Sequence, residues 1–169
     1  SADSTKLTSS AREAAKALLG GKGAGLMEMT ASGVRVPPGL TITTRACLDY
    51  YEGGKKMPRG LVKDVLAKLA VIETTLNRRL GDKSDPLLLS VRSGAKFSMP
   101  GMMDTILNLG MNDEIVTGLA ERSGNERLAW DNYRRFISMF GNVVLDVPKE
   151  KFEHVLTELK TASGIQQDT

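Results

Sequence analysis

The sequence predicts an α+β fold, and three observations carry that prediction. Apolar residues recur at helical spacing in residues 10–19 and 61–80. Two apolar runs flank a glycine-containing loop in residues 87–109, which is typical of strand, loop and second strand. Beyond this unit the pattern is helical only. A mixed α/β part over residues 1–111 and a helical part over residues 112–169 are therefore expected.

A glycine-rich corner is expected near the N-terminus. The first helix should stop at Gly20-Gly21, because consecutive glycines disfavour a helix, and a second should run over residues 24–32 and end at Gly33. Lys22 then lies in a break with the free amides of the next helix, a position that favours anions. A solvated lysine in a plain corner explains the same residues equally well. The corner is not a Walker A motif, which needs a preceding strand and Lys-Ser/Thr after the loop.

The remaining elements follow from spacing, prolines and caps. Pro37 and Pro38 exclude a helix in the segment after Gly33, and residues 40–44 predict a strand. A short helix to Tyr51 and a longer one from Pro58 to Gly81 come next. The helical part should contain three helices with Asn112, Asn125 and Pro148 at their starts, over about residues 113–122, 126–140 and 149–162.

The loop from Ser90 to Thr105 carries the most chemical information in the chain. It combines glycines, a proline and hydroxyl side chains with Arg92 and Lys96. Glycine lets the backbone approach an anion closely, while amides and basic side chains supply donors. Hairpin loops commonly have about 2–5 residues, and longer ones tend to be functional or disordered. Phosphate is the predicted ligand. A plain turn with core-filling methionines is the alternative.

Composition narrows the classes of function. The 169 residues carry a net charge of +3, and their basic residues are scattered among acids, which does not favour nucleic acid. Aromatic residues make up 5%, too few to suggest a platform for stacking bases. No apolar run is long enough to span a bilayer, and the single Cys47 excludes an internal disulfide. One histidine and one cysteine assemble neither a Ser–His nucleophile nor a zinc site.

Several other conspicuous residues are expected to have structural roles. His154 should be solvated on its helix, and Arg134-Arg135 should form surface ion pairs rather than bind phosphate. No cluster of carboxylates suited to Mg²⁺ is evident in the sequence. Packing is the expected role of Cys47, Tyr50, Tyr51 and Trp130.

Four segments resemble the N-terminal part of the pyruvate, phosphate dikinase family. They are Leu19-Gly20-Gly21-Lys22-Gly23, Val36-Pro37-Pro38-Gly39, Ser90-Val91-Arg92-Ser93-Gly94 and Ser98-Met99-Pro100-Gly101-Met102-Met103-Asp104-Thr105. The likeness runs from about Leu18 to the end of the sequence, and the last segment is highly specific. The related pyruvate, water dikinases share the first and third elements. They usually carry acidic residues where this chain has Phe97-Ser98-Met99-Pro100, so they rank second.

The resemblance implies an ATP-grasp-like nucleotide-binding domain. Enzymes of this family interconvert ATP, pyruvate and phosphate with AMP, phosphoenolpyruvate and diphosphate. Their phosphate-binding lysine and arginine fall on Lys22 and Arg92, and their glycine-rich loop falls on residues 94–105. The residues expected to bind ATP or phosphate are Lys22, Arg92, Gly94, Lys96, Ser98, Gly101, Met103 and Thr105.

The resemblance also implies that this chain is one piece of a larger enzyme. The family domain continues for about as many residues again, and that remainder carries the Mg²⁺ ligands. The phosphorylated histidine and the pyruvate-binding barrel belong to later domains, which would be this piece's partners. No catalytic residue is therefore expected here. The family's usual first strand is not reproduced by the opening nine residues.

Further expectations concern the setting of the parent enzyme. ATP and Mg²⁺ are its expected cofactors, and it should be a homo-oligomer in the cytoplasm, or in an organelle of a eukaryote, without nucleic-acid or membrane partners. Two other classes of function remain open. One is a stand-alone nucleotide-binding module without chemistry, and the other is a helical interaction domain built on the amphipathic stretch 58–80.

Overall fold

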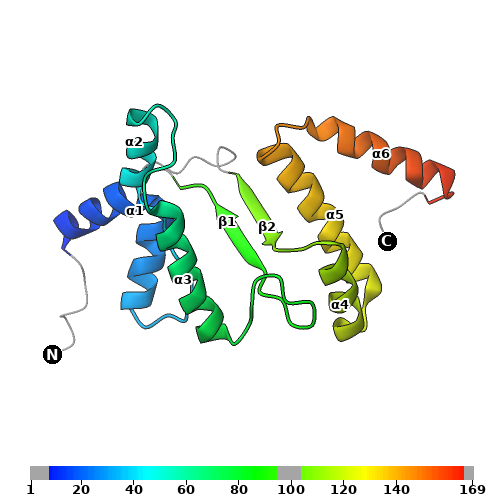
Figure 1. Ribbon diagram of the computed structural model, residues 1–169, viewed down its shortest axis with the longest axis horizontal. Coiled ribbons are helices and arrows are strands. Elements are labelled where there is room, and N and C mark those ends of the chain that lie inside the picture. The colour runs from blue at the N-terminus through cyan, green and yellow to red at the C-terminus, as the bar shows by residue number, and fades with distance from the viewer. Residues whose placement is uncertain (1–7, 95–103, 166–169) are drawn as a thin grey trace. The chain divides into compact units, whose positions relative to one another are not determined.

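The computed structural model describes residues 8–94 and 104–165 and has an α+β fold (Figure 1). Strands β1 and β2 pair with each other as a small antiparallel sheet in this part of the chain. None of the described helices is both long and apolar enough to cross a membrane. The elements in chain order are α1 Ser9–Ala31, α2 Thr44–Glu52, α3 Leu61–Leu76, β1 Leu89–Arg92, β2 Thr105–Leu109, α4 Asp113–Ser123, α5 Glu126–Val143 and α6 Lys149–Ala162.

Contacts within the chain divide it into two compact units. The first unit comprises Ser1–Arg79 and Arg92–Met103, and the second comprises Leu80–Val91 and Asp104–Thr169. The first unit thus contains α1 to α3, while the second contains most of β1 together with β2 and α4 to α6. The predicted boundary between domains at residue 111 stays a prediction.

The second unit has a core between the hairpin and two helices. Helix α5 packs against both α4 and β2. Buried Met111, Val116 and Ala129 form the centre of this core, and Val116 and Ala129 expose none of their surface. Around them pack the half-buried residues Leu88, Leu119, Ala120, Tyr133 and Phe136.

Two glycines allow close approaches of segments within the second unit. At Gly118 in α4, a Cβ atom would overlap the carbonyl oxygen of Lys83, so the loop before β1 crosses directly against the helix. At Gly141 in α5, a Cβ atom would overlap the ring of Phe152 in α6. Both crossings depend on the absence of a side chain, since a methyl group leaves no room for the facing atoms.

In the first unit, α1 consists of two segments that meet at Gly20. This residue is buried and has φ 71° and ψ 170°, a conformation that glycine adopts far more readily than residues with a Cβ. The break predicted from the paired glycines is thereby confirmed. The second segment ends at Ala31, and Gly33 with φ 77° follows, also as predicted.

The helices of the C-terminal part were predicted closely. The starts of α4, α5 and α6 agree with the sequence, and α5 continues three residues beyond its expected end at 140. The Asn112 side chain accepts hydrogen bonds from the amides of Glu114 and Ile115, at 3.0 and 2.9 Å. Asn125 accepts one from the amide of Leu128 at 2.9 Å. Both asparagines are therefore N-caps, as expected.

Two predictions of local structure in the first unit are wrong. Residues 40–43 form no strand, and Thr44 already begins α2. This segment contacts α1 instead of a neighbouring strand, and alternating hydrophobicity alone does not supply a pairing partner. Helix α3 ends at Leu76 rather than near Gly81. Asn77 closes it in the left-handed conformation with φ 51°, its amide donating to the carbonyls of Glu73 and Thr74.

Packing was the role expected of Cys47, Tyr51 and Trp130, but these side chains are largely exposed. Tyr51 is 63% exposed and Trp130 is 46% exposed. Cys47 is exposed as well. The rings of Tyr50 and Tyr51 contact each other edge-on, with centroids 5.3 Å apart, so part of their surface is covered locally. Helical position alone does not reveal which faces find a partner in this piece of chain.

Candidate functional site

The break in α1 creates the corner that holds Lys22. Helical geometry resumes after Gly20, so Gly21 and Lys22 begin the second segment of the helix. The first amides of a helical segment lack partners within that segment and carry partial positive charge. Lys22 is half-buried at this corner. Lys22 therefore lies at the start of a helical segment, as predicted, and anion binding there stays a prediction.

The segment after β1 meets the same corner. A Cβ atom on Gly94 would lie 4.0 Å from the carbonyl oxygen of Leu19, the residue immediately before the break. Arg92 is exposed at the end of β1, two residues earlier. Lys22, Arg92 and Gly94 all belong to the first unit. Two segments more than seventy residues apart in sequence thus converge beside Gly20.

The other predicted binding residues fall elsewhere. Lys96, Ser98, Gly101 and Met103 lie outside the described residues. Thr105 begins β2 in the second unit and is half-buried there. The described part of the predicted site therefore consists of the α1 break with Lys22 and of the end of β1 with Arg92 and Gly94.

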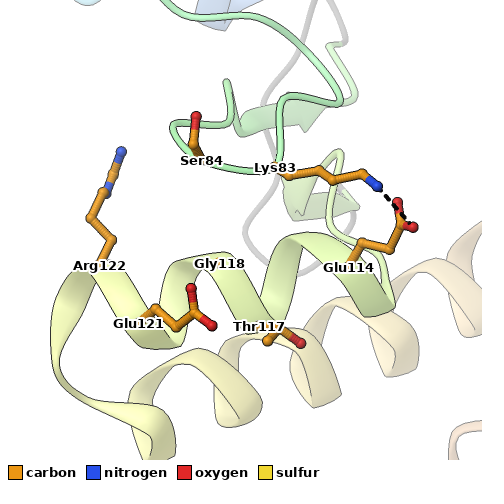
Figure 2. A pocket seen from close by; sticks show the side chains of 7 residues that line it. All are labelled: Lys83, Ser84, Glu114, Thr117, Gly118, Glu121 and Arg122. Atoms are coloured by element: carbon orange, nitrogen blue, oxygen red, sulfur yellow. Dashed lines mark ion pairs between the residues drawn. The ribbon is translucent and has the colours of Figure 1, made fainter.

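A separate surface hollow lies in the second unit, between α4 and the loop before β1 (Figure 2). Its volume is about 540 Å³, and it was not anticipated from the sequence. Lys83 pairs with Glu114 at 3.0 Å across it, and Arg122 pairs with Asp85. Because its basic side chains are matched by acids, the hollow offers no excess of positive charge for a phosphate. It is lined by Lys83, Ser84, Glu114, Thr117, Gly118, Glu121 and Arg122.

The two arginines of α5 form ion pairs, as predicted. Arg134 and Arg135 donate to opposite oxygens of Asp131, with shortest distances of 2.6 Å each. Hydrogen bonds from Arg134 and then Arg135 lower the pKa of Asp131 from its usual 3.8. The guanidinium groups of Arg134 and Arg135 are therefore both used in ion pairs with Asp131.

The described residues assemble no group of side chains suited to metal binding. Across 8–94 and 104–165, no three His, Cys, Asp or Glu side chains gather as a metal site would require. The side chain of His154 is 73% exposed and lies 3.3 Å from Glu158 on the same helix. His154 is thus solvated, as the sequence predicted.

Comparison with known sequences relates part of the chain to a described family. Residues 16–59 match the family described as "Pyruvate phosphate dikinase, AMP/ATP-binding domain". This span contains the α1 break, Lys22 and α2. A further match is to the chloroplastic pyruvate, phosphate dikinase of Mesembryanthemum crystallinum, with 58% identity over 154 residues.

Other curated relatives agree with this match. The chloroplastic pyruvate, phosphate dikinase 1 is 56% identical over 154 residues in Arabidopsis thaliana and 53% identical over 161 residues in Oryza sativa subsp. japonica. These alignments cover 91% to 95% of this chain but only 16% to 17% of each relative. The chain is thus similar to one piece of these proteins. In sequence, the chain is similar to one piece of the pyruvate, phosphate dikinases, and its residues 16–59 match the AMP/ATP-binding domain of that family.

Proposed function

We propose that this chain forms one wall of the ATP site of a pyruvate, phosphate dikinase. Lys22 at the α1 break and Arg92 at the end of β1 bind the phosphates of the nucleotide. The observation that carries the proposal is the approach of Gly94 to the carbonyl of Leu19, which brings the segment after Arg92 to the corner that holds Lys22. A polyphosphate needs several donors from different segments, and this corner can supply backbone amides and two cations.

The glycine-rich loop completes the proposed phosphate site. Lys96 adds a third cation, and Ser98 adds a hydroxyl donor. Gly94, Gly101 and Met103 contribute backbone close to the ligand. In this proposal, the domain that holds the nucleotide has the ATP-grasp-like fold that the family resemblance implies. Its role in phosphoryl transfer is to position the phosphates and to offset their charge.

The chemistry belongs to the whole enzyme. It converts ATP, pyruvate and phosphate to AMP, phosphoenolpyruvate and diphosphate by way of a phosphorylated histidine outside this chain. Mg²⁺ accompanies ATP in such reactions. The described residues offer no carboxylate cluster for that ion, so none of them is assigned to it. The remaining domains are this chain's partners. The chloroplastic names of several relatives support an organellar location in a plant parent.

A titration of the chain with ATP and Mg²⁺ tests the proposal. Amide signals of residues 21–24 and 92–94 should shift in ¹H–¹⁵N spectra, with affinity in about the millimolar range because the site is incomplete. Lys22→Met and Arg92→Met should each weaken binding about tenfold or more, since a hydrogen bond to a charged group contributes roughly 1.5–3 kcal/mol. Purified chain alone should turn over no pyruvate.

Lys63→Met is the matched control, because it removes one positive charge from exposed α3 in the same unit. It should leave ATP binding within about twofold of the original, since exposed charges act weakly. Shifts confined to other residues, or normal binding by both Lys22→Met and Arg92→Met, would remove the site assignment.

A further inference from the structure

The hydroxyl of Thr44 bridges α2 to the end of the first segment of α1. Thr44 Oγ1 donates to the carbonyl oxygen of Ala17 at 2.7 Å and lies 3.2 Å from that of Leu18. In an uninterrupted α-helix, these two carbonyls would accept the amides of Gly21 and Lys22, four residues further on. The side chain of Thr44 therefore contacts the acceptors that the break at Gly20 releases.

The residues just before Thr44 contact the other side of the break. A Cβ atom on Gly23 would lie 3.3 Å from the methyl carbon of Thr41 and 2.9 Å from Cβ of Leu19. A side chain at position 23 would thus push Thr41 away from the second segment of α1. Residues 41–44 consequently touch both segments, with Gly23 on one side of the break and Ala17 on the other.

This contact explains why the segment is not the strand that its sequence suggests. Its hydroxyl and methyl groups are used against α1 rather than in a sheet. The same part of the corner faces Gly94 through the carbonyl of Leu19. The start of α2 thus contacts the carbonyls of Ala17 and Leu18, and the segment after β1 comes close to that of Leu19.

We infer that Thr44 is a positioning residue for the phosphate-binding corner. By bonding the carbonyls of Ala17 and Leu18, it stabilises the break in the geometry that leaves the amides of Gly21 and Lys22 available to a polyphosphate. Thr44 does not touch the ligand. This inference rests on the proposed function, because it concerns the same corner.

Variants at position 44 separate the hydroxyl from the shape of the side chain. Thr44→Val keeps the branched shape and removes the donor, whereas Thr44→Ser keeps the donor. Thr43→Val is the control, since Thr43 precedes α2 and makes no side-chain capping bond. Each variant is compared with the original chain by ¹H–¹⁵N spectra, first alone and then with ATP–Mg²⁺ or with inorganic tripolyphosphate.

Thr44→Val should shift the amide signals of Gly21 and Lys22 before any ligand is added. It should also weaken both ligands about two- to tenfold, the range expected for one lost hydrogen bond. Thr44→Ser and Thr43→Val should bind within about twofold of the original. Equal losses for ATP and tripolyphosphate identify the phosphate tail, rather than the nucleoside, as the part that depends on Thr44.

The outcomes distinguish this inference from the proposed function. If the original chain shows no response to ATP at residues 21–24, the phosphate site itself is wrong. If it responds and Thr44→Val behaves identically, Thr44 has no positioning role, although the site stands. Should Thr44→Val lose its circular dichroism, Thr44→Ala supplies the same test with a smaller side chain. Unfolding of both variants would assign Thr44 to stability alone and overturn the inference.

Discussion

The hydroxyl of Tyr133 in α5 donates a hydrogen bond of 2.6 Å to Oδ1 of Asp113 in the first turn of α4. The acceptor carboxylate lies at a helix N-terminus, where negative charge is favourable. The hydrogen bond to Asp113 is the main cause that raises the pKa of Tyr133 above 10.0. Helices α4 and α5, which pack against each other, are therefore also joined by this exposed hydrogen bond.

Tyr133→Phe should lower the free energy of unfolding by about 0.5–1 kcal/mol, a modest amount because the bond is exposed. Because the pKa of Tyr133 is raised on folding, this stabilisation is complete below pH 10.0 and is lost as the pH rises through the native pKa. Urea unfolding of both proteins as a function of pH measures the difference. A difference that stays constant above pH 10.0 would show that the hydroxyl proton is not responsible.

Gly118→Ala should destabilise the second unit although alanine favours a helix. The added methyl group would overlap the carbonyl oxygen of Lys83, and moving that backbone costs about 1–3 kcal/mol. Thermal unfolding of the chain gives the measurement. Gly25→Ala in α1 is the matched control, because its Cβ meets nothing within 4 Å and should raise stability by up to about 1 kcal/mol. Equal effects of the two substitutions would contradict the close crossing of α4.

Gly20→Ala should disturb the proposed phosphate-binding corner. At φ 71° and ψ 170°, a residue with a Cβ is strained by roughly 1–3 kcal/mol, so the chain should relax away from the native break. Amide signals of Gly21 and Lys22 should move, and the response to ATP should fall. Gly39→Ala, where a Cβ meets nothing within 4 Å, should leave those signals in place. Native-like spectra for Gly20→Ala would show that the corner does not need this backbone geometry.

Asp131→Asn should change the acid stability of the second unit. The bonds from Arg134 and Arg135 lower the native pKa of Asp131, so its stabilisation is present above pH 3.8 and is lost as the pH falls through the native pKa. The two proteins should therefore differ in unfolding free energy near neutral pH and converge in acid. Denaturant unfolding across this range measures the convergence. Parallel curves at every pH would mean that the ion pairs contribute nothing to stability.

The C-terminal helices were predictable because their signals are local. Asn112 and Asn125 cap α4 and α5 through bonds that span two or three residues, and the apolar spacing lies within each helix. The break at Gly20 is equally local, since glycine alone tolerates its backbone conformation. Such features follow from short stretches of sequence and do not depend on the rest of the fold.

The misjudged segments depend on distant partners. Residues 40–43 have the composition of a strand, yet Thr44 bonds to carbonyls 26 and 27 residues earlier, and no short pattern announces that contact. The approach of Gly94 to Leu19 spans a still longer stretch. Half of the candidate site, with Lys22, was therefore deducible from local glycines. The other half, with Arg92, was deducible from the donor-rich loop, but no short pattern announces that the two segments converge.

The small sheet has a practical consequence for handling the protein. In the described residues β1 and β2 pair only with each other, so each strand has an outer row of backbone groups without a neighbouring strand. Val91 and Leu107, one on each strand, are 45% and 42% exposed. Open edges with apolar side chains promote self-association at high concentration. A single gatekeeper change, Leu107→Lys, should raise the solubility limit while leaving the buried Ile106 in the core.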